Sequence, residues 1–274
     1  MADLSDRRGV LYPAKLPSFY RQPADESLRA LVRWFWIPRW DLAPGRVSRQ
    51  ELLPFPASNL VVEPGGVSLA GPTTGASHRD LRGRGWAVGA LLRPAGIASL
   101  APDPRAIQDI QVPFDAPDLH QTVLTAMRDG DETAARDRAV LAYSAWVAER
   151  LAPPDEGGLL ANAMDDLISS DRTIVRVDQV AERLSTSIRG VQRLAQRYVG
   201  LTPLTIIRRY RLQEAAQRLR DDPGLTIARV AADLGYADHA HLTTDFRRIL
   251  GFTPSSYRGQ PDPPDGVDKP GSSG

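Results

Sequence analysis

Two sets of polar side chains, about fifty residues apart, have the types and spacing that suit the edges of nucleic-acid bases. The first set consists of Arg189, Gln192, Arg193, Gln196 and Arg197, and the second of His239, His241, Thr243, Thr244 and Arg247. Arginine and glutamine pair with base edges in the DNA major groove, which is wide enough to admit a helix. The pattern predicts double-stranded DNA as a partner.

The individual side chains suggest different contacts. We expect Arg189, Gln192 and Arg193 to contact bases, and Gln196 lies on the same face. Arg197, Thr243 and Arg247 are assigned to phosphate, and His239, His241 and Thr244 to bases or the nearby sugar. The second set has fewer cations near its start, so it is expected to bind less strongly. Asp245 is expected to add local repulsion toward DNA.

Both sets lie on the second helix of a unit that occurs twice. The stretch Gly200-Leu-Thr-Pro203 recurs as Gly251-Phe-Thr-Pro254. Ser187 and Asp238 have oxygens that cap a helix start. Apolar residues at helical spacing precede them, namely Val177, Val180, Ala181 and Leu184 in the first copy and Ile227, Val230, Ala231 and Leu234 in the second. Each copy is therefore predicted to be a helix, a tight turn and a helix, the arrangement that puts its second helix in the major groove.

The spacing of the two units fits one stretch of duplex. A helix over residues 204–220, started by Pro203, would extend about 26 Å. Successive major-groove segments on one side of B-DNA lie about 34 Å apart. One chain could thus contact a site with two halves. The alternative is that these are solvated faces of ordinary surface helices, and the duplication of caps, turns and cationic faces argues against it.

Residues 157–258 resemble the DNA-binding domain of AraC/XylS-type transcriptional regulators. The residues that carry the resemblance are Ser187-Ile-Arg-Gly-Val-Gln-Arg-Leu194, Gly200-Leu-Thr-Pro203, Arg211-Leu212, Ala215-Ala216, Leu219, Ile227, Val230-Ala231, Gly235-Tyr236, Phe246, Gly251-Phe-Thr-Pro254 and Tyr257-Arg258. The resemblance implies seven helices, two helix-turn-helix units, and activation or repression at promoters, with RNA polymerase as a further partner. Ala195 and Leu242 stand where that family often has Phe, and Thr244 where it often has Arg.

The first half of the chain has a different pattern. Short apolar stretches at residues 31–37, 59–63, 67–71 and 86–92 alternate with Pro and Gly, which favours a small β-barrel or sandwich. Helical periodicity follows at residues 118–128 and 131–151, and these two segments could form an antiparallel hairpin. We expect an α+β chain with a sensor or dimerisation domain at 1–151, a linker at 152–158, an all-α domain at 159–258 and a disordered tail at 259–274.

The N-terminal half also loosely resembles an uncharacterised domain often found ahead of this DNA-binding unit, through the stretches at residues 34–38 and 52–62. The resemblance implies a small-molecule effector, a homodimer, or both. Trp34, Trp36, Trp40, Phe55 and Trp86 could line an apolar pocket, although buried aromatic residues are more often plain core. A dimer contact is expected on the helices at residues 118–151.

Composition narrows the function class. The absence of Cys excludes disulfides and thiolate chemistry, and His78 and His120 are too far apart in different patterns to suggest a metal pair. We find no motif for a cofactor, nucleophile or phosphate loop, and expect no enzyme. Apolar runs are too short for a membrane span, and residues 1–10 do not resemble a signal peptide, which predicts a cytoplasmic protein. A catalytic N-terminal domain and a purely architectural DNA-binding protein remain the alternatives.

The charge is uneven along the chain. Residues 171–258 carry 15 Arg and 9 acidic residues, which gives +6 and leaves −5 for the rest of a chain whose net charge is +1. The positive charge is thus concentrated where the DNA contacts are predicted.

Overall fold

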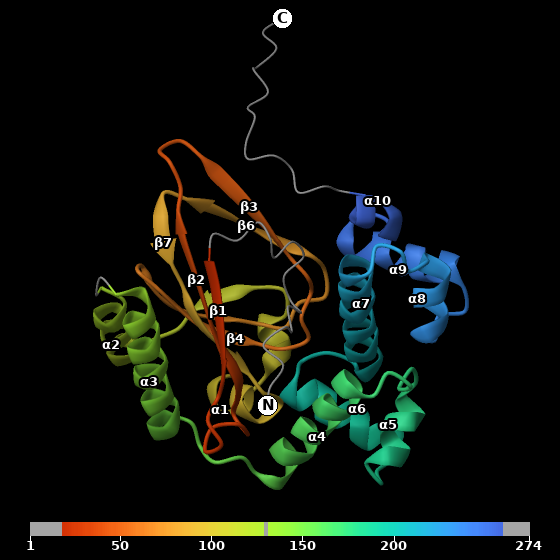
Figure 1. Ribbon diagram of the computed structural model, residues 1–274. Coiled ribbons are helices and arrows are strands. Elements are labelled where there is room, and N and C mark those ends of the chain that lie inside the picture. The colour runs from red at the N-terminus through yellow and green to blue at the C-terminus, as the bar shows by residue number, and fades with distance from the viewer. Residues whose placement is uncertain (1–17, 129–130, 260–274) are drawn as a thin grey trace, which may run out of the picture.

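The N-terminal half is built around an antiparallel sheet (Figure 1). The computed structural model describes residues 18–128 and 131–259. The main sheet has the order β1-β2-β8-β4-β5-β9, with β7 paired to β2, and β3 pairs separately with β6. Their bounds are β1 (Ser18–Pro23), β2 (Val32–Asp41), β3 (Val47–Leu52), β4 (Asn59–Glu63), β5 (Gly66–Ala70), β6 (Ser77–Arg82), β7 (Arg84–Trp86), β8 (Val88–Leu92) and β9 (Gln111–Pro113).

The local sequence explains the central strands. All five residues of β8 are buried, as their uninterrupted apolar run predicts for a strand covered on both faces. The β4–β5 hairpin pairs Leu60 with Leu69 and closes from Glu63 to Gly66. Gly66 has a φ of 146°, which favours glycine at this turn. The expected sheet-rich half is confirmed, and the described strands form an open sheet, which fits the sandwich alternative and not a closed barrel.

Two helices lie side by side at the edge of this half (Figure 1). These are α2 (Pro117–Met127) and α3 (Glu132–Arg150), which match the expected pair of helical segments. Val123 and Val147 are buried in one core with the sheet residues Phe35 and Leu60. Tyr143 on α3 links this helix to β4, because its hydroxyl donates a hydrogen bond to the Leu60 carbonyl at 2.7 Å.

The C-terminal half is entirely helical in the described residues, as expected, and contains seven helices. They are α4 (Glu156–Ser170), α5 (Val177–Arg183), α6 (Ile188–Tyr198), α7 (Pro203–Asp221), α8 (Ile227–Asp233), α9 (His239–Leu250) and α10 (Pro254–Gly259). Helix α7 runs between two groups, α4 to α6 at one end and α8 to α10 at the other (Figure 1). Its 19 residues span about 28 Å.

Helix α4 begins at Glu156, within the segment expected to be a linker. Its start is capped by Asp155, whose Oδ1 accepts a hydrogen bond from the Gly158 N–H at 2.6 Å. The Tyr198 hydroxyl donates to the same carboxylate at 3.0 Å. The Gly158 N–H and then the Tyr198 hydroxyl hold the pKa of Asp155 below its ordinary value. Residues that suggest a flexible connection thus form an ordered first turn.

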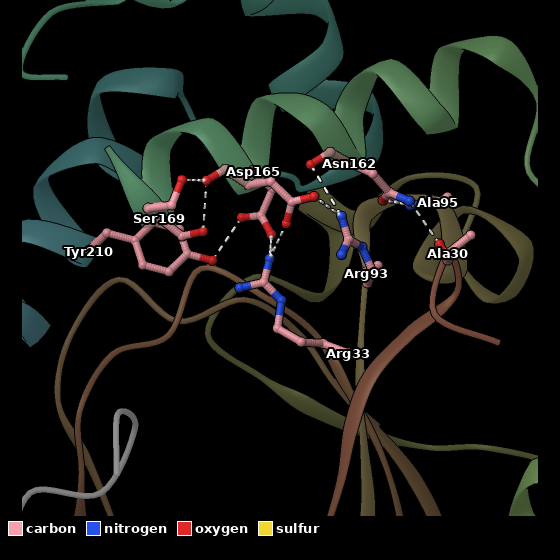
Figure 2. A network of polar contacts seen from close by, with 10 residues as sticks. Ala30, Arg33, Arg93, Ala95, Asn162, Asp165, Ser169 and Tyr210 are labelled. Carbon is pink, nitrogen blue, oxygen red and sulfur yellow. Dashed lines mark hydrogen bonds and ion pairs between the residues drawn. The ribbon is translucent and has the colours of Figure 1, made fainter. Parts of the chain in front are cut away.

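A polar network joins α4 to the N-terminal half (Figure 2). Arg33 on β2 donates to Asp165 Oδ2 at 2.5 Å, and the Tyr210 hydroxyl of α7 donates to Asp165 Oδ1 at 2.7 Å. The Asp165 side chain is 5% exposed and the Arg33 side chain 15% exposed. Because a buried carboxylate needs compensating partners, the three groups depend on one another.

Neighbouring residues extend this contact. Arg93 donates to Asp166 Oδ2 at 2.6 Å. The amide of Asn162 bonds to two backbone groups, accepting from the Ala95 N–H at 3.0 Å and donating to the Ala30 carbonyl at 2.8 Å (Figure 2). Helix α4 therefore packs against both halves of the chain, since it also contributes Met164 and Ile168 to the core of α5 and α6.

Some sequence-based expectations fall on other parts of the chain. Residues 1–10 and residues 260–274 of the expected tail lie outside the described residues, whereas Gly259 ends α10. Across residues 18–128 and 131–259, no helix has the length and hydropathy needed to cross a bilayer.

Candidate nucleic-acid interface

The first helix-turn-helix unit, α5 and α6, is fixed by backbone hydrogen bonds in its turn. Ser185 has a φ of 49°, a left-handed conformation that turns the chain sharply after α5. The Thr186 N–H then donates to the Ala181 carbonyl at 2.9 Å. Ser187 caps α6, because its Oγ accepts from the Gly190 N–H at 3.0 Å. The turn therefore fixes where the second helix begins.

The second unit, α8 and α9, repeats these devices at equivalent places. Gly235 takes the left-handed conformation with a φ of 68°, and the Tyr236 N–H donates to the Ala231 carbonyl at 2.9 Å. Asp238 caps α9 by accepting from the His241 N–H at 2.7 Å. The first helices of the two units are offset by 50 residues and the second helices by 51. The second turn thus contains one additional residue, Ala237, and keeps the same hydrogen bonds.

The exposed face of α6 contains all five residues predicted there, Arg189, Gln192, Arg193, Gln196 and Arg197. The first four line an open hollow of about 510 Å³ together with Ser187. None of the three arginines forms an ion pair within the described part of the chain, although the Arg197 guanidinium lies 5.3 Å from the centre of the Tyr198 ring. The helix contains no acidic residue, so this face can attract phosphate and donate to bases.

The corresponding face of α9 is less cationic. His239, His241, Thr244 and Arg247 are exposed, and Thr243 is half-buried. The hydroxyls of Thr243 and Thr244 donate to the helix carbonyls of His239 and Ala240 at 2.8 and 2.9 Å. In this arrangement the threonine protons are not directed at a ligand. The two helices therefore offer different hydrogen-bonding groups from the same framework.

Asp245 does not face outward. Its residue is 5% exposed, and its Oδ1 accepts from Arg248 Nη2 at 2.8 Å. The expectation that Asp245 repels DNA is wrong, because Asp245 lies on the same side of the helix as buried Leu242 and Ile249 and is paired with an arginine. Arg248 therefore differs from Arg197 at the equivalent position of the first unit, which has no such carboxylate partner in the described residues.

The N-terminal half approaches the first recognition helix closely. The short 3-10 helix η2 (Pro104–Ile107) packs beside the end of α6, where Gly200 has a φ of 83°. A Cβ at Gly200 would lie 2.7 Å from the Pro104 carbonyl carbon, so this contact requires glycine. Asp103 and Arg105 share a cleft of about 610 Å³ with Arg193, Gln196 and Arg197. The sequence patterns gave no indication of this proximity.

The five aromatic residues predicted to line a ligand pocket lie in three places. Trp40 and Trp86 line one open cleft of about 680 Å³ together with Met127. The Trp34 and Phe55 rings meet edge to face with centres 6.1 Å apart. Trp36 donates through its indole N–H to Asn59 at 2.9 Å. The structure thus brings two of the five to one cleft, and ligand binding there stays a prediction.

Comparisons with known proteins agree with the geometry of the helical half. Residues 180–260 match a family model described as a helix-turn-helix domain, and residues 11–110 match a domain of unknown function (DUF6597). A putative AraC-like transcription regulator of Streptomyces lividans is 32% identical over 121 residues, which are 41% of this chain and 40% of that protein. The transcriptional activator RhaS of Pectobacterium carotovorum is 36% identical over 83 residues, 30% of this chain and 29% of that protein.

The similarity to these relatives is confined to part of each protein, since the chain spans about two fifths of the length of the first. Among solved structures, ToxT of Vibrio cholerae is similar over 82% of this chain and 96% of its own, with 14% identity and a TM-score of 0.42. The helical half contains two equivalent helix-turn-helix units, matches the helix-turn-helix family model over residues 180–260, and shares this segment with AraC-like regulators. The helical half of the chain is therefore a DNA-binding domain of the AraC type.

Proposed function

We propose that the chain regulates transcription by binding a DNA site with two halves, one for each helix-turn-helix unit. The observation that carries the proposal is the face of α6, where three arginines and two glutamines are exposed without an acidic residue on the same helix. Arg189, Gln192, Arg193 and Gln196 would contact base edges, and Arg197 would contact phosphate. Residues 159–258 would form the DNA-binding domain, with 1–151 as the controlling domain and 152–158 between them.

The second unit would contribute a weaker contact in the neighbouring major groove. His239, His241 and Thr244 would contact bases or sugar, and Thr243 and Arg247 would contact phosphate once the two threonine hydroxyls turn away from the helix carbonyls. The length of α7, about 28 Å, is close to the 34 Å between successive groove segments once the turns at its ends are added. A regulator of this kind would act in the cytoplasm on promoter DNA, and its direct effect on RNA polymerase would decide activation or repression.

The test begins with selection of duplexes from a random pool by the purified full-length chain. We expect an enriched site with two halves about one helical turn apart. Failure to prefer any duplex over random competitor would remove the proposal. Arg197→Ala should then weaken binding to all sequences equally and reduce the slope of log K against log salt by about 0.9, since one phosphate contact is lost. A change confined to one base position would contradict that assignment.

Control by an effector is the second part of the proposal. The cleft between β7 and the end of α2 offers the indoles of Trp40 and Trp86, which suits an aromatic ligand. Its charged lining is of both signs, with Arg39 and Arg84 beside Asp41 and Glu132. A metabolite screen by thermal unfolding tests this idea, because a ligand at 100 times its Kd stabilises by about 2.7 kcal/mol. Substituting Trp86 by Ala should abolish that shift, whereas Trp36→Ala, outside this cleft, should leave binding of the ligand intact.

Dimerisation through α2 and α3 is the other route of control. Leu141 on α3 is 72% exposed, in a helix whose opposite face is packed on the sheet. Sedimentation of the wild-type chain and of Leu141→Asp would show whether this face joins two copies. A wild-type chain that stays monomeric at micromolar concentration, with and without DNA, would remove this part of the proposal.

A further inference from the structure

Three residues between β3 and β4 join the N-terminal half to both helix-turn-helix units. We call Leu53, Pro54 and Phe55 the bridging segment. Leu53 is 4% exposed and belongs to the apolar core of the second unit, although it lies more than 150 residues earlier in the chain. That core otherwise consists of residues from α7 to α10, among them Leu212, Ala216 and Phe246. The second unit is therefore completed by a side chain from the N-terminal half.

Phe55, two residues later, packs against the core of the first unit. The centre of its ring lies 5.9 Å from that of Tyr210 on α7, edge to face. Tyr210 in turn donates to Asp165, so Phe55 adjoins the polar network that joins α4 to β2. Alternate residues of one extended segment thus enter the cores of two different units, one on each side of the middle of α7.

Hydrogen bonds hold the segment between these two insertions. Gln213, which is 1% exposed, donates from Nε2 to the Pro54 carbonyl at 2.8 Å. On the opposite side the Phe55 N–H donates to Thr73 Oγ1 at 2.9 Å, and the Thr73 N–H donates to the Phe55 carbonyl at 3.0 Å. The fixed φ of Pro54 further limits the conformations of the segment. The bridging segment is thus attached to α7 and to the N-terminal half at the same point.

A second contact reaches the recognition helix of the second unit. The Ala76 N–H, in the loop before β6, donates to the Ile249 carbonyl near the end of α9 at 3.0 Å. This carbonyl, at the end of α9 where no further helical N–H can reach it, thus accepts its hydrogen bond from the N-terminal half. Together with η2 beside α6, the N-terminal half touches both recognition helices. The units also approach each other directly, since a Cβ at Gly235 in the second turn would lie 2.8 Å from Cγ1 of Val175, just before α5. The placement of one recognition helix relative to the other therefore depends on α7, on this approach and on the contacts from the N-terminal half.

We infer that the bridging segment acts as an internal ligand of the DNA-binding half and fixes the placement of one unit relative to the other. The inference rests on the proposed function, because the placement matters when both recognition helices occupy one duplex. The buried side chain of Leu53 and the partly buried side chain of Phe55 pack on opposite sides of Gln213 and stabilise a single arrangement of the two units. A change in the N-terminal half that moves residues 53–55 would alter this arrangement, and with it the affinity for a two-half site.

Hydrogen exchange on the full-length chain tests the inference without DNA. Leu53→Ala should raise exchange rates at least fivefold in residues 227–250, and Phe55→Ala should do so in residues 177–198, because each removes packing from one core. Val47→Ala is the matched control, since Val47 is 44% exposed on β3 and enters neither core. If both variants change exchange only within residues 47–82, the bridge does not stabilise the units and the inference is wrong.

Binding to one-half and two-half duplexes tests the consequence. We expect Leu53→Ala to raise the Kd for the two-half duplex roughly tenfold and the Kd for the first half alone less than twofold. Leu53→Val, a milder truncation, gives a smaller change in the same direction and serves if Leu53→Ala does not fold. If the wild-type chain prefers no DNA sequence, the proposed function is refuted. The hydrogen-exchange experiment would still show whether the bridging segment stabilises the two units. If the wild-type chain binds selectively and the variants bind the two-half duplex with the same Kd as the wild type, the inference is overturned and the proposed function stands.

Discussion

The two helix-turn-helix units share a framework but not a recognition surface. In both units a left-handed residue ends the first helix, at Ser185 and Gly235, and a side-chain oxygen caps the second, at Ser187 and Asp238. A residue with a φ of 83° follows each second helix, and both are glycines. These backbone devices set the angle between the two helices of a unit, so their repetition preserves the frame while other positions differ.

The difference lies at equivalent positions on the second helices. Position by position, Arg193 corresponds to Thr244, and Arg197 to Arg248. Helix α6 has three arginines and no acidic residue, a charge of +3, whereas α9 has two arginines and one aspartate, a charge of +1. The Thr244 hydroxyl and the Arg248 guanidinium are bonded within the protein, to a helix carbonyl and to Asp245. The comparison shows that the same backbone frame can carry different side chains, and we expect the first unit to contribute most of the affinity for DNA.

The largest expected effect concerns the cores of the two units. Phe246 and Ala195 occupy equivalent positions and are both fully buried, but Phe246 packs with Phe252 and Tyr257 at ring distances of 6.0 and 5.9 Å. Phe246→Ala should lower the free energy of unfolding of the chain by about 3–5 kcal/mol, which urea denaturation measures. Ala195→Phe should instead cost about 1–3 kcal/mol through overpacking. If both changes cost less than about 1 kcal/mol, the two cores are not specifically packed.

An intermediate effect is expected on the recognition surfaces. Arg193→Ala should reduce discrimination at one base position by about 1–3 kcal/mol if the proposed contact of Arg193 to a base is bidentate. The matched variant Thr244→Ala should change discrimination in the second half-site by less than about 0.5 kcal/mol, because the Thr244 hydroxyl already bonds to the helix. Fluorescence anisotropy with duplexes changed at single base pairs measures both values.

Two results would oppose this ranking of the units. Equal losses for Arg193→Ala and Thr244→Ala would mean that the threonine hydroxyl turns away from the helix on binding. A uniform loss for Arg193→Ala over all sequences would move Arg193 from the bases to the phosphates. The converse variant, Thr244→Arg, should strengthen binding of the second half-site if its position faces the groove as Arg193 does.

Periodicity and caps were enough to predict the helical half, because turns and helix ends are determined by neighbouring residues. The offset between Ser187 and Asp238 located both recognition helices, and residues 59–63 matched a strand. The contact between halves could not be predicted in this way. Arg33 and Asp165 are 132 residues apart, and nothing local to either one indicates the partner. The buried position of Leu53 in the second unit is of the same kind.

Asp245 shows a further limit of the sequence patterns. A carboxylate on a helix expected to face DNA was taken to face solvent, yet Asp245 lies three residues after Leu242 and four before Ile249, on the buried side of α9. Arg248, one turn later, pairs with it. A helical pattern gives the angle of a side chain around its helix, but the partner that neutralises a buried charge depends on tertiary packing. The aromatic residues of the N-terminal half illustrate the same limit, since their composition did not tell which of them meet.

The smallest expected effect at neutral pH concerns Tyr236 in the second unit, for which Tyr210 on α7, also buried, is the comparison. Within residues 18–128 and 131–259 the Tyr236 hydroxyl has no hydrogen-bond partner, whereas the Tyr210 hydroxyl donates to Asp165 at 2.7 Å. Tyr236→Phe should therefore leave the free energy of unfolding at pH 7 unchanged or raise it by up to about 1 kcal/mol. Tyr210→Phe should lower it by about 1–3 kcal/mol, because Asp165 loses a donor in a buried site.

Alkaline pH enlarges the effect of Tyr236→Phe. Burial raises the pKa of Tyr236 to about 12, although Arg211, whose guanidinium lies 4.1 Å from the ring centre, opposes the rise. The unfolded chain ionises near its ordinary pKa of about 10, so stability is complete below pH 10 and is lost as the pH rises toward 12. Relative to wild type, Tyr236→Phe should gain about 1.4 kcal/mol at pH 11. Urea denaturation at pH 7 and pH 11 measures this difference, and an equal response of both proteins to pH would show that the Tyr236 hydroxyl reaches water.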